Sequence, residues 1–441
     1  MSPAEIGVVM IAAMLALMVL RAPIFLSMAL VGAAGYVWLV GPAPLLNYLK
    51  GSLGSLFVSY DLSVVPLFLL MGNFAARAGI SQELFAACNA WVGHRRGGLA
   101  ISTILGCAGF GAICGSSLAT ASAMARFALP EMRRHGYSGA LSAGTLAAGG
   151  TLGILIPPSV VLIIYAILTE QNVVKLFLAA TIPGLIAVAG FILAVMIYVR
   201  LVPGAAGPVT ERKPLRQRLL ALRDVSHVVA IFAIVLGGIY GGLFTPTEGA
   251  AVGAVITGIV AVIFGGLRWR GFIDAALETA AATAMICAIV FGADLFNVAL
   301  ALTRVPMQMA DWIGEAGIAP YAVLLVIILI YLVLGCVMDS LSMILLTVPI
   351  IFPAFMALDF GLLAEQQALW FGILTLIVVE LGMITPPVGL NLFIISLLAK
   401  DIPTRDIFVG VIPFLCSEAV RVVLIAVFPV LSYWLVGIVF G

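Results

Sequence analysis

Apolar runs of membrane-spanning length follow one another along the whole chain, separated by short polar stretches. A bilayer core is crossed by about 20 apolar helical residues, and helices satisfy their own backbone hydrogen bonds in lipid. Two long apolar runs contain a proline pair, at Pro157-Pro158 and at Pro386-Pro387. Proline lacks a backbone donor and clashes with the preceding turn, so each pair predicts a membrane helix that is broken near its middle.

Basic clusters between the apolar runs predict the orientation. Placing all of them in the cytoplasm satisfies the positive-inside rule and leaves both termini in the periplasm. The clusters lie at 94–96, 133–135, 200–223, 268–270 and 400–405. The expected spans are 5–21, 23–40, 62–77, 140–169 and 176–200, then 228–243, 248–266, 276–302, 367–399 and 407–436. Five is an odd number of crossings, so the second group is inserted in the opposite sense to the first.

Two apolar stretches, 98–131 and 320–355, do not fit as crossings because each lies between two loops on the same side. Each is therefore predicted to be a hairpin that returns to its own side, with its tip near the midplane. The tips are Gly115-Ser116-Ser117 and Met338-Asp339-Ser340. Small residues also serve close helix packing in membranes, which explains the first tip equally well. The mirrored second tip, which carries a carboxylate, favours a site.

The order and spacing of these features recur, which predicts two copies of one unit. The expected fold is an all-α polytopic membrane protein with an inverted repeat, two re-entrant hairpins and two broken helices, as in secondary transporters. The first repeat covers 1–201 (hairpin 98–131, broken helix 140–169), a cytoplasmic linker covers 202–227, and the second repeat covers 228–441 (hairpin 320–355, broken helix 367–399).

Two further stretches, 81–93 and 306–318, mix polar and apolar residues around Trp91 and Trp312. They suit helices that lie along the bilayer surface and join a mobile unit to a fixed frame. Ordinary connectors between spans would have the same composition, so both interpretations stay open here.

Composition narrows the range of functions that this protein could have. The chain of 441 residues is 63% hydrophobic and 9% charged, which excludes a soluble protein, and its net charge of +1 argues against a nucleic-acid partner. The sequence contains no phosphate-binding GxxxxGK[ST] motif, HExxH motif or Ser-His-Asp set. We therefore expect no ATP-driven step, no enzymatic activity and no cofactor.

Ionisable groups inside spans are functional candidates because they are costly in lipid. Asp339 is the first of them, since it falls at a predicted tip beside Ser340. A sodium ion would neutralise its carboxylate through oxygen coordination; an ion pair with an arginine or a protonated relay acid are the other interpretations. Glu380, Glu418 and Arg421 are predicted to pair with one another.

The two breaks supply complementary chemistry. An interrupted helix frees carbonyls at one end, which suit a cation, and N–H groups at the other, which suit a carboxylate. A simple glycine–proline kink would explain one break but explains two symmetric ones poorly. The first break is flanked by Thr151, Gly153 and Pro157, and the second by Gly382, Thr385, Pro386 and Asn391.

Several of these segments resemble the large membrane subunit of tripartite ATP-independent periplasmic (TRAP) transporters. The most specific are 115–132, GSSLATASAMARFALPEM, and 144–159, GTLAAGGTLGILIPPS. The stretches 244–250, 338–340 and 385–391 are similar as well. The resemblance implies sodium-driven uptake of a small organic acid, a carboxylate, across a bacterial inner membrane by an elevator movement.

The resemblance also implies site residues and partners. Sodium would bind between each hairpin tip and the neighbouring broken helix, at Gly115, Ser116, Gly153, Pro157, Asp339, Gly382, Thr385 and Pro386. The expected substrate contacts are Ser116, Ser117, Thr151, Asp339, Ser340, Thr385 and Asn391. The implied partners are a small four-helix membrane subunit, expected as a separate polypeptide, and a periplasmic substrate-binding protein.

Two other functions are compatible with parts of this pattern. One is a stand-alone sodium- or proton-coupled carrier of organic or divalent anions with the same architecture. The other is a non-transporting membrane enzyme or assembly scaffold, for which the sequence offers no catalytic constellation.

Overall fold

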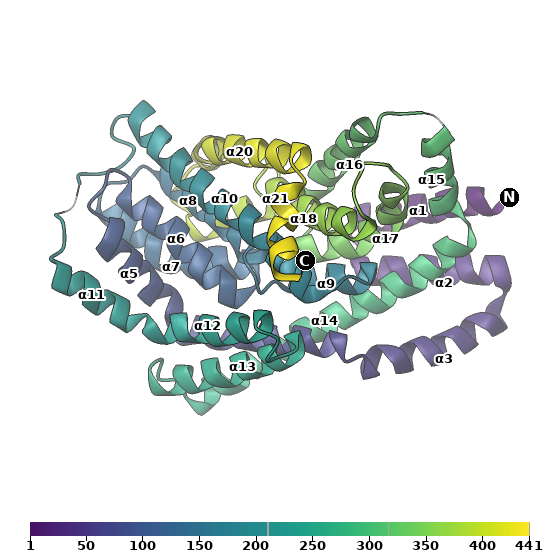
Figure 1. Ribbon diagram of the computed structural model, residues 1–441, viewed down its shortest axis with the longest axis horizontal. Coiled ribbons are helices and arrows are strands. Elements are labelled where there is room, and N and C mark those ends of the chain that lie inside the picture. Colours follow the sequence, from purple (N-terminus) through teal and green to yellow (C-terminus); the bar gives the residue numbers. More distant parts are fainter. Residues whose placement is uncertain (210, 316, 441) are drawn as a thin grey trace.

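The computed structural model describes residues 1–441 apart from Thr210, Ala316 and Gly441, and every regular element in the described part is a helix (Figure 1). Five of these helices are long and apolar enough to cross a membrane, or up to eight if each of three bent pairs is one span. The predicted all-α polytopic fold is confirmed.

One part of the protein is a frame of helices from both halves of the sequence. Its tightest contact is between α2 and α14, because glycines let the two backbones approach. A Cβ on Gly32 would lie 2.7 Å from the backbone nitrogen of Phe296, and one on Gly292 would lie 2.6 Å from the carbonyl of Phe25. Helix α4 packs against α13 and α14. The frame comprises α1 (Pro3–Val19), α2 (Ile24–Val40), α3 (Pro42–Val58), α4 (Val64–Arg77), α12 (Ser226–Tyr240), α13 (Pro246–Ile263) and α14 (Trp269–Leu302).

The other part contains the predicted hairpins and broken helices. Its innermost elements are α8 and α18, whose side chains are almost all buried. From the first half of the chain it contains α6 (Gly98–Cys114), α7 (Ser117–Arg134), α8 (Gly139–Leu155), α9 (Val160–Thr169) and α10 (Val173–Leu201). From the second half it contains α16 (Pro320–Gly335), α17 (Ser340–Met356), α18 (Ala364–Met383), α19 (Leu390–Leu398), α20 (Thr404–Val427) and α21 (Val430–Phe440).

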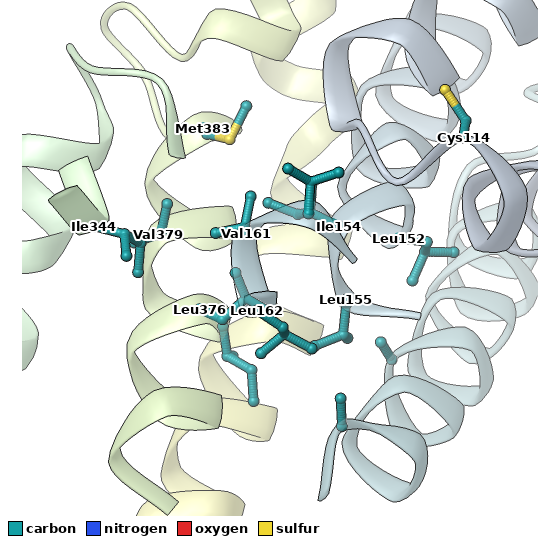
Figure 2. Packing of buried hydrophobic residues seen from close by; sticks show 14 of the residues in the cluster. Cys114, Leu152, Ile154, Leu155, Val161, Leu162, Ile344, Leu376, Val379 and Met383 are labelled. Carbon is teal, nitrogen blue, oxygen red and sulfur yellow. The ribbon is translucent and has the colours of Figure 1, made fainter. Parts of the chain in front are cut away.

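The two halves of this second part exchange contacts reciprocally. The second arm of the first hairpin, α7, packs against α19, and the second arm of the other hairpin, α17, packs against α9. The long helices do the same, since α20 packs against α8 and α10 against α18. Figure 2 shows the apolar centre of this packing, where Val161 and Leu162 of α9 lie beside Ile344 of α17 and Val379 of α18. Each hairpin therefore packs against the broken helices of both halves, since α6 and α7 also contact α8, and α16 and α17 also contact α18.

Two short helices connect the frame to the hairpins at the places where the sequence suggested surface helices. Helix α5 (Ile80–Val92) is bent by 64° from α4 and packs against α6 and α7, and α15 (Val305–Glu315) packs against α17. Both connections turn at a residue with left-handed backbone, Gly79 (φ +77°) before α5 and Arg304 (φ +57°) before α15.

The structure differs from the sequence predictions in two places. Residues between the second and third expected spans form the helix α3, whose Tyr48 and Ser52 hydroxyls donate to Asp294 of α14 at 2.7 and 2.5 Å. The predicted single span 407–436 is wrong: it is two helices, α20 and α21, because Pro429 follows the end of α20 and has no N–H to continue it. A further helix, α11 (Leu215–Asp224), lies inside the predicted linker.

Candidate functional site

The first hairpin turns at Gly115, which ends α6 with left-handed backbone (φ +64°), a conformation that glycine adopts without steric cost. Ser116 then caps α7, and its hydroxyl accepts a hydrogen bond from the N–H of Ala119 at 3.4 Å. The tip is therefore a glycine C-cap followed directly by a serine N-cap.

This tip lies against the first broken helix. A Cβ added to Gly153 would lie 2.7 Å from the carbonyl oxygen of Ser116 and 2.5 Å from the Thr120 hydroxyl. A Cβ on Gly115 would lie 3.3 Å from the carbonyl oxygen of Pro158. The structure thus brings Gly115, Ser116 and Gly153 together beside the diproline, as a junction rich in backbone oxygen. We call it the first tip–break junction.

The second hairpin repeats the arrangement. Asp339 caps α17 by accepting a hydrogen bond from the N–H of Ser342 at its Oδ2 atom, 3.1 Å away. A Cβ on Gly382 would lie 2.7 Å from the Cα of Gly335, and Gly389 donates its N–H to the carbonyl of Cys336 at 3.2 Å. The second tip and second break therefore form a second tip–break junction. The peptide bond between the two prolines is cis in both breaks.

A hydrogen bond joins the two halves of the site. The Ser117 hydroxyl lies 3.0 Å from Oδ1 and 2.8 Å from Nδ2 of Asn391, and this amide also donates to the carbonyl of Ala147 at 3.1 Å. Both side chains are buried. Ser117 and Asn391, predicted separately as substrate contacts, are therefore bonded to each other.

The remaining predicted site residues are placed as follows. Thr151 donates its hydroxyl proton to the carbonyl of Ala148 in its own helix at 2.7 Å. Thr385, which follows the end of α18, donates to the carbonyl of Leu381 at 2.6 Å. Ser340 is buried at the start of α17. Among the hydrogen bonds and ion pairs of the described residues, none joins Asp339 to the first junction. The roles of these residues in binding stay predictions.

Sequence reasoning missed Thr120 and Gly335. Thr120 is fully buried on α7 and points its hydroxyl at the first break. It lies one helical turn after Ser116, so helical spacing from the tip could have indicated it. Gly335 permits the close approach of the second hairpin to Gly382, and only the three-dimensional packing shows that role.

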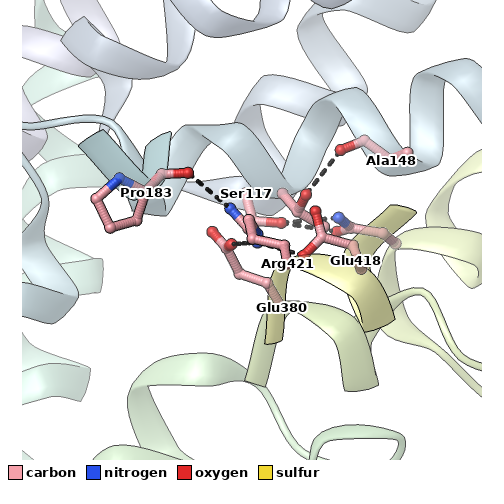
Figure 3. Close-up of polar contacts among 8 residues, drawn as sticks. Ser117, Ala148, Pro183, Glu380, Glu418 and Arg421 are labelled. Carbon is pink, nitrogen blue, oxygen red and sulfur yellow. Dashed lines mark hydrogen bonds and ion pairs between the residues drawn. The ribbon is translucent and has the colours of Figure 1, made fainter. Parts of the chain in front are cut away.

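Beside the junctions, Glu380, Glu418 and Arg421 form a buried cluster, as the sequence predicted (Figure 3). The Nη2 atom of Arg421 contacts both carboxylates, that of Glu380 at 3.1 Å. The cluster links α18 to α20, the two long helices that follow the hairpin of the second repeat.

Comparison with known proteins shows the family of this chain. Residues 11–431 match the family described as "Tripartite ATP-independent periplasmic transporter, DctM component". The chain belongs to this family. The chain is 38% identical over 374 residues to the C4-dicarboxylate TRAP transporter large permease protein DctM of Pseudomonas aeruginosa, a match that covers 85% of each protein. It is 32% identical over 373 residues to the sialic acid TRAP transporter large permease protein SiaM of Vibrio cholerae, over 84% of this chain and 85% of that protein.

The fold of this chain is similar to that of a solved transporter, YdaH of Alcanivorax borkumensis, with a TM-score of 0.59 over 88% of this chain and 89% of that one. The two sequences are 16% identical, so the likeness concerns the fold alone. The resemblance inferred from the sequence is confirmed. The protein is a multi-pass large permease component of a tripartite transporter and not an enzyme.

Proposed function

We propose that this chain is the sodium-coupled subunit that carries a small organic acid into a bacterial cell across the inner membrane. The observation that supports this most is the pair of tip–break junctions. Each places backbone carbonyls of a hairpin tip against a broken helix, with Ser116 at the first junction and Asp339 at the second. Hard cations prefer such oxygen ligands. Gly115, Gly153 and Pro157 would complete the first sodium site, and Gly382, Thr385 and Pro386 the second.

The directions of the helices support an anionic substrate. Four helices of the site, α7, α9, α17 and α19, begin at the tips and breaks, at Ser117, Val160, Ser340 and Leu390. The N-terminus of a helix carries unpaired N–H groups and a partial positive charge, so it favours a carboxylate. The relatives named above are transporters of C4-dicarboxylates and of sialic acid, and both substrates carry carboxylates. The same chemical class is proposed here.

The division of the protein supports an elevator movement. The part that holds both junctions would move against the frame, and α5 and α15 would act as its connections, since each joins a frame helix to a hairpin. The moving part would draw equally on the two repeats, 1–201 and 228–441. Non-helical backbone at membrane depth is tolerated when protein covers it, as the reciprocal packing of hairpins and broken helices does here.

The proposal includes two partners. A tripartite transporter with a large permease has a small one as well, and we expect it as a separate four-helix membrane subunit. A periplasmic binding protein would deliver the substrate, with both termini of this chain on the periplasmic side. The basic residues between the spans support this orientation through the positive-inside rule.

The test is uptake into proteoliposomes that contain this chain, the small permease and the loaded binding protein. An inward sodium gradient should drive accumulation of the organic acid, and an equal potassium gradient should not. Equal uptake under both gradients would refute sodium coupling. Equal uptake without the binding protein would instead favour the stand-alone carrier.

A further inference from the structure

The linker between the two repeats contains an amphipathic helix, α11. Leu215, Leu219 and Leu222 follow one another at i, i+4 and i+7, so they form one stripe along this helix. These three residues are 64%, 53% and 43% exposed. Leu220 is exposed as well but lies off the stripe by helical spacing. The stripe is therefore an apolar surface that no other described part of the chain covers.

Basic residues surround the apolar stripe. The segment 211–224 contains five basic residues and two acidic ones, which gives it a net charge of +3. Four of the basic residues are exposed, and among the ion pairs of the described residues none involves them. They are Arg212, Lys213, Arg216 and Arg223. The two acids, Glu211 and Asp224, are the first and last residues of the segment, so its middle is uniformly positive.

The fifth basic residue, Arg218, joins α11 to α5. It is 5% exposed, its carbonyl accepts a hydrogen bond from Nε1 of Trp91 at 3.2 Å, and its guanidinium lies 5.7 Å from the centre of the Trp91 ring. Its Nη2 atom lies 3.3 Å from Nδ1 of His94. Directly after α11, Nε2 of His227 lies 3.0 Å from Oε2 of Glu83 in α5. Helix α11 therefore packs along α5 (Figure 1), and the exposed leucine stripe lies outside this contact.

The position of α11 along the chain brings it to the membrane surface. Helix α12, the first span of the second repeat, begins at Ser226, and α11 is bent by 50° from it. In the orientation proposed above, this bend lies on the cytoplasmic side. A basic amphipathic helix beside a span fits the headgroup region, where leucines reach acyl chains and arginines meet phosphates. A groove on a partner protein could take such a helix too, but the adjacent span keeps α11 at the bilayer.

We propose that α11 binds the cytoplasmic leaflet, with its leucine stripe among the acyl chains and its basic residues on the headgroups of anionic phospholipids. Because Arg218 joins α11 to α5, the bound lipid also holds α5 at the membrane surface. This second step rests on the proposed function, in which α5 connects the frame to the moving part. The lipid contact itself depends on neither transport nor sodium.

Spin-label accessibility tests the lipid contact in proteoliposomes that contain this chain and the small permease. Labels are attached to Leu219→Cys, in the stripe, and to Gln217→Cys, on the opposite face, each combined with Cys416→Ala because Cys416 is an exposed native cysteine. The label at 219 should collide more with oxygen, which concentrates in lipid, and the label at 217 more with a water-soluble nickel complex. Strong nickel access at 219 would place the stripe in water, and protection from both reagents would place it under a protein. Either result would overturn the proposal.

Lipid charge supplies the second measurement. Adding phosphatidylglycerol to phosphatidylcholine vesicles should raise the oxygen access of the label at 219 several-fold, and salt should reduce this rise because it screens the attraction. A triple variant, Arg212→Gln with Arg216→Gln and Arg223→Gln, should not respond to phosphatidylglycerol. Arg405→Gln, at an exposed arginine that begins another helix, should keep the response. A wild type that does not respond, or a triple variant that responds fully, would refute binding of anionic lipid.

Uptake separates the anchoring of α5 from the lipid contact. Sodium-driven uptake by the wild type should be several-fold faster in vesicles with phosphatidylglycerol than in those without it, and the triple variant should lose this difference. Equal wild-type uptake in both kinds of vesicle would contradict the anchoring of α5. Absence of uptake in every vesicle would count against the proposed function, while the label measurements would still decide the lipid contact.

Discussion

Ser117 and Asn391 are hydrogen-bonded at 2.8 to 3.0 Å although 274 positions separate them in the sequence. Ser117 begins α7 of the first hairpin, and Asn391 lies in α19, the short half of the second broken helix. The Asn391 amide also reaches the carbonyl of Ala147 in α8. One side chain therefore connects three of the irregular segments on which the proposed transport site depends.

Asn391→Ala should destabilise the protein by about 1–3 kcal/mol, because it leaves buried polar groups without their partner. It should also impair uptake, since the first hairpin loses its contact with the second repeat. Thermal unfolding in detergent and uptake into proteoliposomes measure the two effects. Ser396→Ala in the same helix is the control, because within the described residues that hydroxyl bonds only the Phe393 carbonyl one turn away. Equal behaviour of the two variants would contradict the structural role of Asn391.

Gly153→Ala should separate the first tip from its broken helix. The added Cβ would lie within 2.7 Å of the Ser116 carbonyl, and such overpacking costs about 1–3 kcal/mol. We expect loss of sodium-driven uptake with a moderate loss of thermal stability. Gly237→Ala is the matched control, since a Cβ there meets nothing within 4 Å. Normal uptake by Gly153→Ala would show that the close contact is dispensable.

Asp339→Asn should abolish or strongly reduce sodium-driven uptake while leaving the fold intact. Asparagine keeps the N-cap hydrogen bond to Ser342 but removes the negative charge. Thr385→Ala should impair uptake in the same way with little effect on folding. The exposed Asp359, which caps the Gly361 N–H in a loop, provides a control as Asp359→Asn. If uptake by Asp339→Asn and by Thr385→Ala depended on sodium almost as in the wild type, the second junction would not be a sodium site.

We predict different effects on stability for one substitution at each of the connections that lead into α5 and α15. Gly79 has left-handed backbone and open space around its Cβ position, so Gly79→Ala should cost about 1 kcal/mol through backbone strain alone. Arg304 has the same backbone conformation with a side chain, so Arg304→Gly should not destabilise the protein. Thermal unfolding of the two variants decides this. The expectation would be wrong if Arg304→Gly lowered the unfolding temperature and Gly79→Ala left it unchanged.

Local signals in the sequence predicted the elements of the site well. The two diprolines broke their helices as expected, because a proline acts on the turn that precedes it. Gly115-Ser116 and Asp339 formed tips as expected from the basic loops that flank the two hairpins. The acidic pair with Arg421 was also predicted and is confirmed. Charged residues are rare inside apolar runs, so each has few possible partners. Their ion pairs can therefore be predicted from the sequence.

Features that depend on tertiary packing were not predictable in this way. The bond between Ser117 and Asn391 and the approach of Gly335 to Gly382 require knowing which helices become neighbours. Helix α3 was missed because its polar positions lower its hydropathy, although two of them, Tyr48 and Ser52, bond Asp294. Pro429 could have indicated the end of α20, but the apolar residues on both sides of it led to the prediction of one continuous span.

Sodium binding to the purified protein tests the central proposal, that the two tip–break junctions are cation sites. Isothermal titration of wild type, Gly153→Ala and Asp339→Asn with sodium and with potassium measures it. We predict saturable binding of sodium but not of potassium to the wild type, and fewer sodium ions bound by each variant. Identical heats for the two cations, or the same sodium stoichiometry in all three proteins, would contradict the account.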